Sequence, residues 1–284
     1  MANIRAIRAH IKSVESTRKI TSSMRMVAAA KLKKAQSAMN ALRPYATATK
    51  EMLSSVLGCP AARSDPFLRQ REIGRVCYVL LIGDRGLCGL YNNALVRHME
   101  YLAREEKRDY SVIVCGRWSG DALRSASFPV TETITTLSDV PTAEESRALC
   151  EKLKELYLSG GADEIVLVYQ QYRSAFVQIP GSKRLLPLEA PVPEETTDLI
   201  VEPDGAAVLS ELVLLYLENT LASVLLEAKT GEHSARMTAM TTASDNTKEM
   251  LEELRLELNH ARQSAITTEI SEIVGGANAL AHVE

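Results

Sequence analysis

The sequence predicts a mixed α+β and α/β fold: a long antiparallel coiled coil of the N- and C-terminal helices, with an inserted Rossmann-like α/β domain. Both ends of the 284-residue chain carry apolar residues at heptad spacing, and the middle alternates strand-like with helix-like stretches. Aromatic residues make up only 5% of the chain, which suits long helices better than a bulky globular core. We therefore expect an N-terminal helix over 1–57, an α/β domain over 75–190 and a C-terminal helix over 206–284.

The N-terminal part is predicted to be one helix. Its apolar positions begin at Ile4 and continue in steps of three and four residues to Val56, with a polar stretch in the middle. A Gly-Cys-Pro run that ends at Pro60 should stop the helix. Pro44 is expected to bend it, because proline removes a backbone donor. A helix of about 55 residues spans roughly 80 Å.

The C-terminal third is predicted to be a second long helix, because no proline follows Pro203. An apolar stripe opens at Val208, and a three- and four-residue series runs from Met237 to Ala265. The apolar register then shifts by one residue and continues from Ile266. Two helices with such seams are expected to pair with each other.

Charge supports that pairing. Residues 1–57 carry eleven Lys or Arg and two Glu, whereas residues 208–284 carry five Lys or Arg and twelve Asp or Glu. Opposite charges favour the mixed pair and disfavour self-pairing of either helix. Chain order allows an antiparallel arrangement, with the middle segment inserted at one end.

The middle of the chain is predicted to be α/β. Strands alternating with helices imply a mostly parallel sheet covered on both faces, and FVQI after YQQYRSA is expected to form a final hairpin. A proline-rich stretch over 187–205 is the expected link to the C-terminal helix. The expected strands are 76–82, 111–116, 130–135, 164–172 and 176–179, and the expected helices are 92–107, 117–125 and 143–159.

The stretch GDRGLCGLYN, over 83–92, follows a strand and precedes a helix, as a phosphate-binding loop does. Its glycines have the spacing GxxGxxG, however, and no GK[ST] or dinucleotide fingerprint follows. A tight turn at the end of a strand is the favoured interpretation, and binding of a nucleotide phosphate is the alternative.

The sequence contains few other motifs for binding or catalysis. The net charge of −3 argues against a general nucleic-acid binder, and no histidine has metal-ligand spacing with Cys, Asp or Glu. No nucleophile motif stands out, so we expect no catalytic residue, metal or cofactor. Five scattered cysteines without a CxxC fit a reducing compartment, and no apolar run approaches the roughly 18 residues of a membrane span.

Small residues are common inside both heptad seams. They are dense in TSSMRMVAAAKLKKAQ (21–36) and in SARMTAMTTASDNTKEM (234–250). Small side chains let two helices approach closely and make a slim rod. Such a rod suits a shaft that runs inside a collar of other subunits.

Four segments resemble signatures of the gamma subunits of F-type ATP synthases. The glycine loop is similar to the family's SDRGLCGxxN loop, with Gly83 where Ser is usual, and Ser22 and Ser23 replace a more typical Lys-Ala pair. Residues 183–231 leave no room for the redox segment of the chloroplast type. The other segments are ITSSMRMVAAAKLKKAQ (20–36), EHSARMTAMTTASDN (232–246) and LNHARQSAITTEISEIVGGANAL (258–280).

The resemblance implies a central rotor stalk that is a non-catalytic part of an enzyme complex. Its helices would turn inside a ring of alternating alpha and beta subunits, and its α/β domain would lie beside epsilon and on the c-ring. Ion flow through the c-ring would thereby drive ATP synthesis at the beta sites. We expect a peripheral protein without a membrane span on the cytoplasmic face of the bacterial inner membrane, with the mitochondrial matrix face as the alternative.

The resemblance also assigns contacts with the beta subunit. Met24 and Arg25 match the N-terminal motif, which packs near the C-terminal shaft and beta. Arg236, Gln263 and Thr267 match positions that form polar contacts with beta along the shaft.

Three further sites follow from the resemblance. Arg85 and Cys88 match the glycine loop, which lies against an acidic C-terminal loop of beta, and we expect the glycines to hold both side chains outward. Glu202 is a weaker match to a position that contacts the c-ring. The residues expected in the apolar sleeve at the top of the alpha–beta ring are Ile270, Ile273, Val274 and Leu280.

Two other functions remain open at the level of the residues. The α/β segment could belong to a nucleotide-binding enzyme, and the coiled coil could belong to an adaptor of an unrelated assembly. Binding of ATP by the isolated chain would favour the enzyme, whereas ATP hydrolysis that depends on this chain in a mixture with alpha and beta would favour the rotor.

Overall fold

A computed structural model describes residues 2–57, 65–69, 71–188 and 205–281. Contacts group the chain into two compact units. We call residues 28–238 the large unit and residues 1–27 with 239–284 the small unit. Each unit is described by itself below.

Two long helices supply the ends of the chain. α1 extends over Ala2–Val56 and continues through Pro44, and α5 extends over Gly205–Ala281. Most of the predicted seam of α1 is confirmed, although Arg18 and Arg25 in its polar middle are exposed. The buried seam residues are Ile7, Val14, Thr21, Ala28, Leu32, Ala35, Thr49, Leu53 and Val56.

The large unit contains a five-stranded sheet in the order β3-β2-β1-β4-β5. Its first four strands are parallel, and β5 pairs antiparallel with β4, as the predicted hairpin requires. Three shorter helices connect the strands. The elements are β1 (Arg75–Leu81), α2 (Tyr91–Glu105), β2 (Asp109–Cys115), α3 (Asp121–Ser125), β3 (Val130–Ile134), α4 (Ala143–Leu158), β4 (Glu164–Tyr172) and β5 (Gln178–Leu186).

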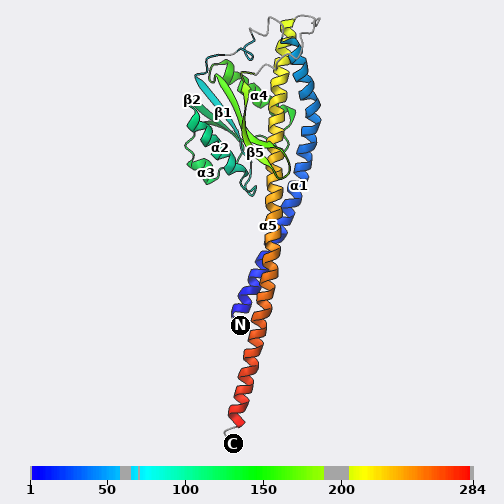
Figure 1. The fold of residues 1–284 in the computed structure, drawn as a ribbon, viewed down its shortest axis with the longest axis vertical. Helices are drawn as coiled ribbons and strands as arrows, with labels where there is room; N and C mark the ends of the chain where they lie inside the picture. The colour runs from blue at the N-terminus through cyan, green and yellow to red at the C-terminus, as the bar shows by residue number, and fades with distance from the viewer. Residues whose placement is uncertain (1, 58–64, 70, 189–204, 282–284) are drawn as a thin grey trace. The chain divides into compact units, whose positions relative to one another are not determined.

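Both faces of the sheet are buried, because alternate residues of a strand point to opposite faces. In β1, Cys77 and Val79 join a cluster with α4 and with the facing parts of α1 and α5, whereas Tyr78 and Leu80 join a cluster with α2. The large unit is therefore a three-layer α/β structure, with the long helices and α4 covering one face (Figure 1).

The start of α5 is a core helix of the large unit. Leu217, Leu221 and Val224 are almost fully buried against the sheet. By length and composition alone, α5 is also apolar enough to cross a membrane, although its sequence has no unbroken apolar run of about 18 residues. In its most apolar window, 44% of the residues are buried inside the protein.

In the small unit, α1 and α5 lie side by side and antiparallel, so the first residues of α1 and the last of α5 point the same way (Figure 1). Val14 packs against Leu251 and Leu254, with Ile11 beside them. Arg255 donates a 3.1 Å hydrogen bond to the carboxylate of Glu15 across the pair. The predicted heptad seam is therefore confirmed here also.

Candidate functional site

The glycine loop between β1 and α2 folds against its own helix. The amide of Gly83 donates to Oδ1 of Asn92 at 2.9 Å. A Cβ at position 83 would lie 2.9 Å from that oxygen and 3.1 Å from Cδ of Glu232, so a larger residue here would press on these two side chains. Leu87 has a positive φ of 61°, a conformation that costs a side-chain-bearing residue energy, and its side chain is exposed.

Four charged side chains join the glycine loop to α5 in the large unit. The ammonium of Lys229 pairs with Asp84 and lies 3.3 Å from Glu232. The guanidinium of Arg236 donates to Glu232 at 2.7 Å and to the carbonyl oxygen of Arg85 at 3.1 Å. Lys229, Glu232 and Arg236 are buried, so this ion cluster is held inside the fold.

Mutual attraction keeps the ion cluster charged. Burial opposes the charged form of Glu232, but Lys229 and Arg236 outweigh it and hold the pKa of this carboxyl below its usual range. Burial likewise opposes charge on Lys229, yet Glu232 and Asp84 raise the pKa of its ammonium. These four groups carry two positive and two negative charges, and the exposed Arg117 lies 3.8 Å from Asp84 at the edge of the cluster.

The ion cluster also explains why the loop makes a poor phosphate cradle. The amide of Asp84 donates to Oε1 of Glu232 at 3.3 Å, so a carboxylate of the chain itself sits where a phosphate would bind. The Asp84 carboxylate lies beside it and would repel a second anion. This geometry favours the tight-turn interpretation over the nucleotide-binding one.

The loop presents its two predicted contact residues differently. Arg85 is exposed, as expected. The expectation that Cys88 points outward is wrong, because its side chain is only 3% exposed. Its thiol lies 3.7 Å from the carbonyl oxygen of Arg85 and accepts from the Asn92 amide at 3.4 Å, which turns it inward. Burial raises the pKa of the Cys88 thiol.

Two further loops of the large unit contact the same part of α5. The hydroxyls of Ser234 and Thr238 donate to the carbonyl oxygen of Ala175, in the β4–β5 hairpin, at 2.7 and 3.3 Å. Nε2 of His233 lies 3.1 Å from the carbonyl oxygen of Asp139, in the loop before α4. Burial lowers the pKa of His233, so the neutral ring is favoured.

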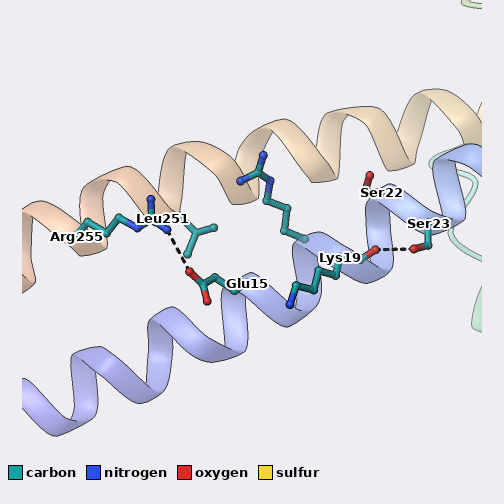
Figure 2. Close-up of a pocket in the computed structure, with 7 residues that line it drawn as sticks. Glu15, Lys19, Ser22, Ser23, Leu251 and Arg255 are labelled. Carbon is teal, nitrogen blue, oxygen red and sulfur yellow. Dashed lines mark hydrogen bonds and ion pairs between the residues drawn. The ribbon is translucent and has the colours of Figure 1, made fainter.

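The small unit has an open groove of about 790 Å³ between α1 and α5. Figure 2 shows Arg255 reaching Glu15 across the groove and the hydroxyl of Ser23 bonded to the carbonyl oxygen of Lys19. The groove is basic, with three cationic side chains against one carboxylate. Its lining residues are Glu15, Arg18, Lys19, Ser22, Ser23, Leu251 and Arg255.

The predicted shaft contacts of the small unit lie on its surface. Met24 is half-buried, whereas Arg25, Gln263 and Thr267 are exposed. Thr267 bonds within the helix, to the carbonyl oxygen of Gln263 at 2.9 Å.

The residues expected in the sleeve form an exposed apolar end of α5. Ile270, Ile273 and Val274 are 56%, 66% and 52% exposed. Their spacing of three and four residues places them on neighbouring positions of one helix, so they form a shared apolar surface. Glu202 and the side chain of Leu280 lie outside the described residues.

The structure thus brings Arg85, Cys88 and Arg236 together in one place. It adds residues that sequence reasoning missed, above all Lys229 and Glu232. Opposite charges at Glu232 and Arg236, four residues apart on a helix, were the available signal. In the part of the chain that is described, no group of three or more His, Cys, Asp or Glu side chains is arranged to hold a metal ion.

Comparison with known proteins matches nearly the whole chain. A family model described as ATP synthase matches residues 3–280. The ATP synthase gamma chain of Moorella thermoacetica is 42% identical over 99% of this chain and all of its own length. That of Desulfitobacterium hafniense is 41% identical with the same coverage, and that of Synechococcus elongatus is 38% identical over 99% of each chain.

Solved structures with a similar fold come from mitochondrial ATP synthases. A chain of the Euglena gracilis complex of OSCP, F1 and c-ring has a TM-score of 0.66 at 16% identity, covering 98% of this chain and 95% of its own. A chain of the Tetrahymena thermophila central stalk and c-ring has a TM-score of 0.59 at 22% identity, covering 79% of this chain and 99% of its own. At these identities the likeness concerns the fold alone.

Proposed function

The chain belongs to the family of ATP synthase gamma chains, and from this membership we propose that it is the central rotor-stalk subunit of an F-type ATP synthase. Its rotation couples ion flow through the c-ring to ATP synthesis or hydrolysis at the beta-subunit sites. This function requires no catalytic group from the chain itself. It transmits torque between the c-ring, through which ions flow, and the beta subunits, at which ATP is made or hydrolysed.

One observation carries this proposal beyond family membership. The end of α5 leaves Ile270, Ile273 and Val274 exposed on a single slender helix. A helix end of this kind gains stability only when an apolar sleeve surrounds it, because each fully buried side chain of this size contributes about 1.5–3 kcal/mol. The alpha–beta collar is the proposed sleeve.

The remaining partners are the beta subunit along the shaft, epsilon, and the c-ring. We assign contacts with beta to Met24, Arg25, Gln263 and Thr267, which lie at or near the surface of the small unit. The basic groove of the small unit would attract acidic segments of the same partner.

On the large unit, Arg85 is the proposed contact with an acidic loop of beta. Cys88 and Arg236 hold this loop from behind, because both are buried and both approach its backbone carbonyl oxygens. Relatives from bacteria support a position on the cytoplasmic face of the inner membrane.

Reconstitution tests the proposed function directly. Purified alpha and beta subunits mixed with this chain should gain ATP hydrolysis, and the isolated chain should bind no ATP by calorimetry. A mixture that gains neither assembly nor activity would contradict the rotor function and favour an unrelated adaptor. Tight ATP binding by the chain alone would favour the nucleotide-binding enzyme.

Arg85→Glu tests the proposed contact within that complex. Like charges would then face each other, so activity should fall at low salt and recover partly as salt screens the repulsion. Arg97→Glu makes the same charge change on an exposed position of α2 and is the control. Equal effects of the two variants would remove Arg85 from the interface.

A further inference from the structure

Two turns of α5 are tied to three loops of the large unit through backbone carbonyl oxygens. Arg236 reaches the carbonyl oxygens of Arg85 and Gly86, at 3.1 and 3.4 Å. Ser234 and Thr238 both reach the hairpin, and His233 reaches the loop before α4. Side chains on several sides of the helix therefore hold it at one rotational angle.

These contacts differ in kind from the apolar packing below them. Apolar side chains such as Leu217 and Leu221 resist separation from the sheet, but their attraction has no preferred direction. Hydrogen bonds weaken steeply when donor and acceptor lose alignment. Turning α5 by one residue step, about 100°, would misalign all of the side chains that reach the loops.

The ion cluster reinforces the same segment. Glu232 accepts from Arg236 on the helix and from the amide of Asp84 on the glycine loop. Lys229 pairs with Asp84 from one turn earlier on the helix. Breaking a buried pair leaves an uncompensated charge, so this contact also resists rotation of the helix against the loop.

We infer that residues 229–238 form a rotational clasp that fixes α5 to the large unit, so that both turn as one body under load. The inference rests on the proposed rotor function and assigns positioning residues for it. Because α5 is continuous from Gly205 to Ala281, torque that enters the large unit passes through this clasp into the helix. Thr238 is the last residue of the large unit, which places the clasp where the helix leaves it.

The variant pair Ser234→Ala with Thr238→Val tests the clasp in the assembled complex with its c-ring in vesicles. The double variant removes both bonds to the Ala175 carbonyl oxygen. Each lost bond is worth about 1 kcal/mol, so hydrogen exchange of the hairpin amides, such as that of Val177, should speed up about fivefold per bond. The ratio of ATP-driven ion pumping to ATP hydrolysis should fall, most strongly against an opposing ion gradient.

Two controls separate the clasp from a general effect on the helix. Ser210→Ala with Thr268→Val makes the same changes at exposed positions of α5 and should leave the ratio unchanged. Ser234→Thr with Thr238→Ser keeps both hydroxyls and should keep most of the wild-type ratio.

The outcomes are distinct. A wild-type complex that pumps ions while hydrolysing ATP upholds the proposed function whatever the variants do. If the double variant speeds up exchange in the hairpin yet keeps the wild-type pumping ratio under load, the clasp carries no torque and the inference is overturned. Failure of the double variant to assemble, with a normal control, would also overturn it, because the contacts would then be needed for folding alone.

Discussion

The two units of the protein hold the long helix α5 in place by different kinds of contact. In the large unit, α5 is packed into a deep core and its buried charges are neutralised within the chain. In the small unit, α5 meets α1 along a narrow seam around Val14, Leu251 and Leu254, and Ile20, Met26 and Val27 stay exposed. The contrast shows that the large unit buries this helix within the chain itself, whereas the small unit leaves more of its apolar side chains exposed.

The largest expected effect comes from removing one charge of the ion cluster in the large unit. Glu232→Ala leaves Arg236 buried without a counter-charge and Lys229 with Asp84 as its carboxylate partner. The change should lower the free energy of unfolding by about 3–5 kcal/mol. Urea unfolding followed by the fluorescence of Trp118, the chain's single tryptophan, reports on this unit. Glu211→Ala, at an exposed position of the same helix within the large unit, should change stability by less than about 0.5 kcal/mol. Similar losses for both variants would mean that the ion cluster contributes nothing special.

The next effect compares the two seams of α5. Leu221→Ala, at a fully buried position of the large unit, should cost about 3–5 kcal/mol, because the surrounding core cannot collapse into the cavity. Leu251→Ala in the small unit should cost nearer to about 2 kcal/mol, since its narrow seam can close around the gap. Circular dichroism follows both helices, and equal losses at the two sites would contradict the contrast between the units.

Acid should destabilise the large unit through protonation of one carboxylate, that of Glu106. Glu106 accepts from Arg108 at 2.7 Å and from the Tyr78 hydroxyl at 3.0 Å, and the hydrogen bond from Arg108 is the main cause that lowers its pKa to about 2. Because this folded-state pKa lies below the ordinary value of 4.5, the stabilisation is complete above pH 4.5 and is lost as pH falls toward 2.

The size of that loss should be about 1–2 kcal/mol, allowing for solvent screening of the pair. Stability of Glu106→Gln, measured by Trp118 fluorescence, should depend less on pH over this range. The neighbouring exposed Glu105→Gln should keep the wild-type pH profile. A wild-type profile in Glu106→Gln would assign the acid sensitivity to other groups.

The smallest expected effect belongs to the surface of the small unit. The side chains of Arg255 and Glu15 are 62% and 44% exposed, so their ion pair should contribute about 0.2–1 kcal/mol. A double-mutant cycle with Arg255→Ala and Glu15→Ala measures this coupling. At about 1 M salt, where the Debye length is about 3 Å, it should vanish. Coupling that survived high salt would show that this pair is more protected than its exposure indicates.

Much of the fold was predictable, because its local signals agree with its packing. β4 has the predicted bounds, since its residues alternate between two buried faces of the sheet. β5 was predicted to end at residue 179 and extends to Leu186. It is an edge strand with Pro180 and Gly181 in its interior, so pairing with β4, rather than its own sequence, sets its length.

The site was less predictable, because its contacts join residues far apart in the chain. Glycine spacing alone identified a tight turn at residue 83, but it could not reveal that Glu232, about 150 positions later, would accept the loop amide. Cys88 was expected to point outward because the resemblance places this loop against an acidic loop of beta. The Asn92 side chain that turns it inward lies in the following helix. Local patterns predict an element, whereas a buried polar contact depends on its distant partner.

The single-residue shift of the apolar register after Ala265 has a mechanical consequence. One residue advances a helix by about 100°, so the apolar face of Ile266, Ile270 and Ile273 points away from the direction of the seam at Leu251 and Leu254. The end of α5 is therefore asymmetric, because one side of the helix is apolar and the opposite side is polar. When such an end spins in a surrounding wall, its energy varies with angle. A wall made of equivalent segments would meet it with equally deep, evenly spaced minima, and the rotor would pause at each.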